Sequence, residues 1–89
     1  MIALPAGLTH EVAAGFVLDL KRQVQSQPGA VVADASALQL FDSSALAVLL
    51  ACRREALAAG KNFSVQGLPV RLRQLATLYG VAELVPPVP

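Results

Sequence analysis

A short apolar run near the middle of the chain, Ala30 to Ala33, follows a Pro28–Gly29 turn and ends at Asp34. Consecutive apolar residues bounded by turn-forming residues are typical of a strand buried on both faces, as in the centre of a parallel sheet. Parallel strands need crossover connections of a dozen or more residues, which are usually helices. The run therefore predicts a central, doubly buried strand over residues 30–34, with a helix before it and a helix after it.

Helical periodicity is present on both sides of this strand. Before it, with Thr9 as the predicted N-cap, one apolar stripe predicts a helix of about four turns: Val12, Phe16, Leu20 and Val24. After it, a helix is predicted to begin at Asp42 or Ser43. Its inward face is expected to carry Leu46, Leu49, Leu50, Arg53 and Leu57, and its opposite side Ala47, Ala51, Arg54 and Ala58.

Glycines and prolines mark the ends of the later elements. Gly60 suits the left-handed position after the second helix, and Gly80 suits the same position after a third helix that begins near Pro69. The inward face of this third helix is predicted to be Leu72, Leu75, Ala76 and Tyr79.

Two further segments are predicted to be strands. Residues 2–4 can form a short edge strand, and residues 63–66 alternate apolar and polar side chains as a half-buried strand does. The resulting alternation of strands and helices predicts an α/β fold, with a small, mostly parallel sheet and right-handed crossover helices packed against it. The 89 residues allow a single domain, placed at residues 1–85, with a proline-rich extended tail at residues 86–89.

The composition is apolar for a chain of this size, with 55% hydrophobic and only 15% charged residues. Soluble domains usually contain about 25% charged residues. The longest unbroken apolar run covers residues 45–52, whereas a membrane-spanning helix needs about 20 such residues. The N-terminus shows neither the basic nor the long apolar region of a signal peptide. We therefore expect a small intracellular domain whose exposed apolar surface serves a partner, and which can self-associate through that surface when the partner is absent.

The sequence offers little for catalysis or metal binding. It contains one histidine, His10, one cysteine, Cys52, and no glycine-rich phosphate loop. Aromatic residues make up only 4% of the chain, which argues against stacking on single-stranded nucleic acid. These features predict a protein that is not an enzyme and that uses neither a metal nor another cofactor.

One segment combines polar side chains with a favourable position. Asp34 ends the predicted central strand, and Asp42-Ser43-Ser44 begin the next helix after a polar loop. Ligands of open α/β sheets gather beyond the carboxyl ends of strands, and a helix start presents unpaired N–H groups. Asp and Ser are also common N-cap residues. Plain helix capping, binding of a partner and phosphorylation of a serine therefore all remain open for this segment.

The stretch from Val31 to Leu46 resembles the signature of STAS domains, which occur in sulfate transporters and anti-sigma-factor antagonists. That pattern is an apolar strand, an Asp or Asn, a short loop, and then Asp-Ser/Thr-Ser/Thr/Gly-Gly-Leu at a helix start. The likeness continues through residues 59–67 and 72–81, where Leu78-Tyr79-Gly80 is most similar to the STAS subunits of Mla-type phospholipid ABC transporters. The family glycine is replaced here by Ala45.

The resemblance implies a STAS fold and an accessory subunit that binds the ATPase of an ABC transporter. Such a subunit would be cytoplasmic, peripheral to the inner membrane through its partner, and would support phospholipid transport and outer-membrane lipid asymmetry. In the alternative, an anti-sigma-factor antagonist, the residue that a partner kinase phosphorylates corresponds to Ser43. Ser43 is thus the central expected site residue, and the expected docking surface around it comprises Asp42, Ser44, Ala45, Ala47, Ala51 and Arg54.

Overall fold

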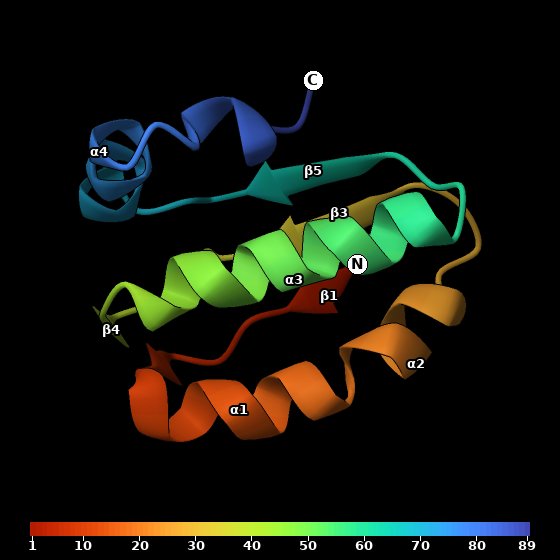
Figure 1. Cartoon of the computed structure of the whole chain (residues 1–89), viewed down its shortest axis with the longest axis horizontal. Helices are drawn as coiled ribbons and strands as arrows, with labels where there is room; N and C mark the ends of the chain where they lie inside the picture. Colours follow the sequence, from red (N-terminus) through yellow and green to blue (C-terminus); the bar gives the residue numbers. More distant parts are fainter.

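Three parallel strands form the main sheet of the computed structural model, which describes all of residues 1–89. They are β1 (Ile2–Ala3), β3 (Val31–Asp34) and β5 (Phe63–Gln66), in the order β1-β3-β5. Helices connect the strands and pack on the sheet (Figure 1). The predicted α/β class, the central place of β3 and the edge position of β1 are confirmed.

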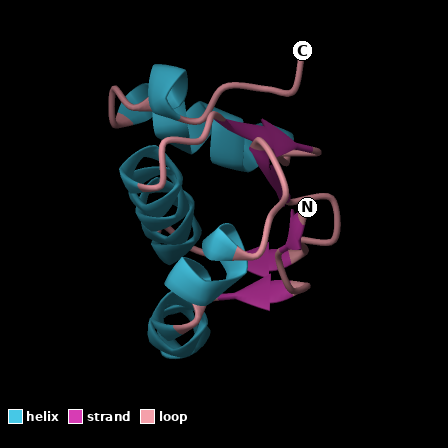
Figure 2. Ribbon diagram, turned by 90° about the vertical axis from the view of Figure 1, so that its right-hand side faces the viewer, coloured by secondary structure: helices cyan, strands magenta, loops and turns pink.

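The prediction that β3 is buried on both faces is wrong. Val31 and Ala33 are fully buried, but Val32 and Asp34 on the other face are only half-buried. Figure 2 shows the reason, because the helices gather on one side of the strands and leave the other side without a helical cover. The continuous apolar run therefore corresponds to a strand with one fully buried face and one half-buried face.

A second, two-stranded parallel sheet joins β2 (Gly7–Leu8) to β4 (Leu40–Phe41). The sequence predicted a polar loop where β4 lies and no strand at the position of β2. Leu8 pairs with Phe41 and is fully buried. This small sheet brings the residues just before the first helix next to the residues just before the third.

The predicted four-turn helix is divided in two. Helix α1 (His10–Leu18) ends at Asp19, and α2 (Leu20–Gln25) follows directly. Leu20 and Val24 are buried as predicted and Phe16 is partly buried against the core, but Val12 is 45% exposed and Ala13 is buried in its place. Alanine contributes little to a hydrophobic pattern, so the periodicity selected Val12 for the buried face at the first turn of α1, where the fold buries Ala13 instead.

Helix α3 (Ser44–Ala58) is the longest helix and lies against the sheet, with seven buried residues. Helix α4 (Val70–Leu78) follows β5. The predicted glycine ends are confirmed, since Gly60 and Gly80 both have φ of +72°. Two predicted inward residues are instead exposed, Leu57 by 50% and Tyr79 by 58%.

The C-terminal segment is attached to the sheet. A 3-10 helix, η1 (Ala82–Leu84), leads to Val85, which is fully buried. Beyond it, the Val65 N–H donates to the carbonyl of Pro86 at 2.8 Å, and the Val88 N–H donates to the carbonyl of Val65 at 3.1 Å. The extended, proline-rich end thus runs alongside β5. None of the helices has the length and hydrophobicity that crossing a bilayer would require.

Candidate partner-binding site

Ser43 occupies the N-cap position of α3, yet its side chain makes no capping hydrogen bond. The neighbouring Asp42 caps the helix instead, because its Oδ1 accepts a hydrogen bond of 2.8 Å from the Ser44 N–H. Ser43 is exposed. Capping by the Asp-Ser-Ser segment is therefore a property of Asp42, and the hydroxyl of Ser43 is left for contacts outside the chain.

Asp42 also contacts the start of α1. Its Oδ2 accepts a hydrogen bond of 3.1 Å from the His10 N–H, whereas Thr9, the predicted cap of that helix, makes no capping bond through its side chain. We call this pair of hydrogen bonds, from Ser44 and from His10 to one carboxylate, the Asp42 bridge. The Ser44 and then the His10 backbone N–H groups lower the pKa of Asp42 below its usual 3.8. The bridging carboxylate is consequently ionised at neutral pH.

A groove runs between α1 and α3 and has a volume of about 440 Å³. We refer to it as the α1–α3 groove, and its lining is mostly apolar: His10, Ala13, Ala14 and Val17 from α1, and Ser44, Ala47, Val48, Ala51 and Arg54 from α3. No carboxylate belongs to this lining. The single salt bridge of the structure joins Arg22 to Asp19, so the exposed guanidinium of Arg54 has no acidic partner within the chain.

The structure separates the expected docking residues into two groups. Ala47 and Arg54 are exposed and Ser44 is half-buried, all three on the α1–α3 groove. Ala45 is fully buried and Ala51 is only 6% exposed. The expected outward side of α3 is therefore corrected: Ala45 belongs to the core, and Ala51 contributes only a small part of the groove wall.

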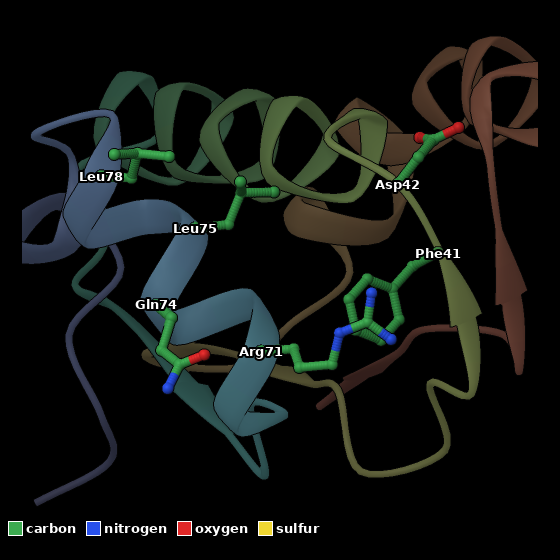
Figure 3. Close-up of a pocket in the computed structure, with 6 residues that line it drawn as sticks. All are labelled: Phe41, Asp42, Arg71, Gln74, Leu75 and Leu78. Atoms are coloured by element: carbon green, nitrogen blue, oxygen red, sulfur yellow. The ribbon is translucent and has the colours of Figure 1, made fainter.

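A second pocket, of about 310 Å³, lies between β4 and α4 and was not anticipated from the sequence. In it the Arg71 guanidinium sits 5.9 Å from the centroid of the Phe41 ring, a cation–π distance. Figure 3 shows the Arg71 guanidinium over the Phe41 ring, with Asp42 next to Phe41 on the segment that leads into α3 and Leu75 on α4. Arg71 and Phe41 lie thirty positions apart, and no local pattern relates them.

The side chain of Asp34, the other acidic residue of the segment, forms hydrogen bonds only within the loop that follows β3. Its Oδ1 accepts hydrogen bonds from the Ser36 N–H at 3.0 Å and from the Ser36 hydroxyl at 2.6 Å. The Ser36 hydroxyl and then its N–H lower the pKa of Asp34. Asp34 and Ser43 share no hydrogen bond, so the two halves of the sequence segment have separate roles.

Ser43 thus lies between two recesses. The residue before it, Asp42, lines the β4–α4 pocket, and the residue after it, Ser44, lines the α1–α3 groove. The exposed hydroxyl of Ser43 therefore lies next to a mostly apolar groove on one side and a pocket of mixed polar and apolar lining on the other.

The family model described as "Mlab, STAS domain" matches residues 1–86, which is nearly the whole chain. No curated protein matches the chain.

Proposed function

Because this chain belongs to the STAS domain family, as an MlaB-like member, we propose that it is a non-enzymatic accessory subunit that binds the ATPase of an Mla-type ABC transporter. In this role it supports phospholipid transport and outer-membrane lipid asymmetry from the cytoplasmic side of the inner membrane. The docking surface is Ser43 together with the exposed side of α3 along the α1–α3 groove.

The observation that carries the proposal is that the hydroxyl of Ser43 is exposed and takes no part in capping its own helix. A serine at a helix start ordinarily satisfies a backbone N–H of its own helix, but here Asp42 fulfils that task and the hydroxyl is exposed. The surface beside it is made of small side chains, which allow close approach of a partner. Arg54 offers a charged group at the edge of that surface, where interfaces are usually polar.

Two substitutions test this surface by different means. Ser43→Asp adds a carboxylate at a helix N-terminus, where negative charge is favourable, so the helix itself is not weakened. Ala47→Arg places a long side chain in the α1–α3 groove at an exposed position of α3, and arginine is a good helix former. Both variants are expected to lose co-purification with the ATPase while their far-UV circular dichroism matches that of the original chain.

Matched variants serve as controls. Ser43→Thr keeps the hydroxyl and should retain binding. Ala58→Arg makes the same change as Ala47→Arg at another exposed position of α3, near its C-terminal end and outside the groove lining, and should also retain binding. Normal co-purification of both Ser43→Asp and Ala47→Arg would refute the proposed surface.

A second candidate function, the anti-sigma-factor antagonist, is favoured by the same free hydroxyl. A phosphate on Ser43 would lie at the N-terminus of α3, where the helix dipole favours negative charge. Against it stands the ionised carboxylate of Asp42 on the adjacent residue, with no cation bonded to it. Intact mass of the protein isolated from cells distinguishes the two functions, because only the antagonist requires a phosphorylated form.

A further inference from the structure

Helix α1 forms one wall of the α1–α3 groove but is weakly held by its side chains. Ala13 is its only buried residue, whereas α3 has seven. Larger apolar side chains of α1 are exposed to solvent instead: Val12 by 45%, Val17 by 39% and Leu18 by 86%. Phe16 is partly buried against the core, but a helix whose only fully buried side chain is an alanine requires other contacts to keep a fixed position relative to its neighbour.

Backbone contacts at its first turn provide such an anchor. The β2–β4 pairing places Leu8 beside Phe41, and the next residues of each segment lead to His10 and Asp42. The Asp42 bridge follows directly, joining the first N–H of α1 and the first N–H of α3 through one carboxylate. Both helices begin at this end of the groove (Figure 1), so the bridge acts where their spacing is set.

We propose that Asp42 is a positioning residue that fixes the start of α1 against the start of α3, and that the α1–α3 groove has its docking-competent shape only while the Asp42 bridge is intact. The first part concerns the free chain. The second part rests on the proposed ATPase interface, since it assigns a consequence for docking. In this account Asp42 acts through α1 and does not need to touch the partner.

The bridge can be opened without altering Asp42 or Ser43. His10→Pro removes the N–H that donates to Asp42, and proline is well tolerated at the first position of a helix. The preceding residue, Thr9, has φ −97° and ψ 175°, the extended conformation that a residue before proline prefers. His10→Ala is the matched control, because it removes the same imidazole and keeps the N–H.

The experiment measures ATPase affinity by titration calorimetry and α1 amide shifts by NMR for these variants. Relative to His10→Ala, His10→Pro is expected to weaken binding roughly tenfold, the size of one charge-assisted hydrogen bond, and to shift the amides of residues 11–14. Asp42→Ala opens the bridge from the acceptor side and should weaken binding at least as much. When Asp42→Ala is also present, the two His10 variants should bind the ATPase with the same affinity.

The outcomes separate this proposal from the preceding one. If His10→Pro and His10→Ala bind equally well while Ser43→Asp abolishes binding, the positioning role is refuted and the interface stands. If the two His10 variants still differ in ATPase affinity when Asp42→Ala is also present, the His10 N–H acts through a group other than Asp42. The proposal then also fails. If Ser43→Asp and Ala47→Arg bind normally, the interface is refuted, and the amide shifts that Asp42→Ala causes in residues 11–14 of the free chain still decide whether Asp42 positions α1.

Discussion

Replacing Gly67 by alanine is expected to be among the most damaging single-methyl additions to this chain. Gly67 follows β5 and has φ of +68°. A Cβ built there would lie 2.7 Å from the Cβ of Ser36, 2.9 Å from its Cα and 3.1 Å from its backbone nitrogen. Two of these three atoms are backbone, so rotation of a side chain cannot relieve the contact.

The environment of Ser36 makes the contact still harder to relieve. The Ser36 N–H and hydroxyl are both held by Asp34, and the neighbouring Ala35 N–H donates to the carbonyl of Gln66 at 2.8 Å. The loop and the end of β5 are therefore tied together at the point where the methyl group would enter. Moving them apart requires breaking at least one of these hydrogen bonds.

Two other glycines make it possible to separate the two parts of the expected loss of stability, namely the cost of the left-handed backbone conformation and the cost of the contact with Ser36. Gly60 and Gly80 have φ of +72°, almost the same as Gly67, but no atom lies within 4 Å of a Cβ added to either. For alanine at these two positions we expect only the cost of the left-handed conformation, about 1–2 kcal/mol. Gly67→Ala adds overpacking, which typically costs about 1–3 kcal/mol more. Its total is a large part of the roughly 5–15 kcal/mol by which small domains are stable.

Urea unfolding followed by far-UV circular dichroism measures the three variants under the same conditions. The unfolding midpoint of Gly67→Ala should be lower than those of Gly60→Ala and Gly80→Ala, with an unchanged slope in each case. Equal midpoints for all three would show that the approach of Ser36 carries no energetic weight, and the reasoning would be refuted.

Two further predictions concern ionisable groups. Burial, and then the nearby carboxylate of Glu55, raise the pKa of the Cys52 thiol to about 11, so labelling by a thiol reagent at mildly alkaline pH should occur only as the protein unfolds in urea. Rapid stoichiometric labelling of the folded protein would contradict this. Asp34 and Asp42 have folded pKa values below 3.8, so their contribution to stability is complete above that value and is lost as the pH falls through the lowered folded pKa values. The urea midpoint should decrease in acid, and a variant with both Asp34→Asn and Asp42→Asn should show a smaller decrease.

The elements with strong local signals were predicted well from the sequence. The apolar run of β3, the alternation of β5 and the glycines that end α3 and α4 each follow from the conformational preferences of a few adjacent residues. The position of the Asp-Ser-Ser segment at the start of α3 was also predicted. The STAS resemblance carried by these residues is confirmed by the family match.

Predictions that depended on an exposed or buried face were less successful. Alanine is common in α1 and α3 and barely distinguishes an inward from an outward position, which is why Ala45 and Ala51 were expected on the surface and Val12 in the core. The two-residue strands β2 and β4 are too short to show any periodicity. Their pairing is a long-range contact that no local pattern contains.

The sequence by itself therefore determined the α/β class, the order of the main elements and the residue at which the candidate site lies. Only the tertiary structure decided which side chains of that segment are hydrogen-bonded and which are free. It assigned capping to Asp42, left the hydroxyl of Ser43 free, and joined His10 to a carboxylate 32 positions away. The physical reason is that local conformation depends on neighbours along the chain, whereas these hydrogen bonds depend on how the β2–β4 pairing brings two distant helix starts together.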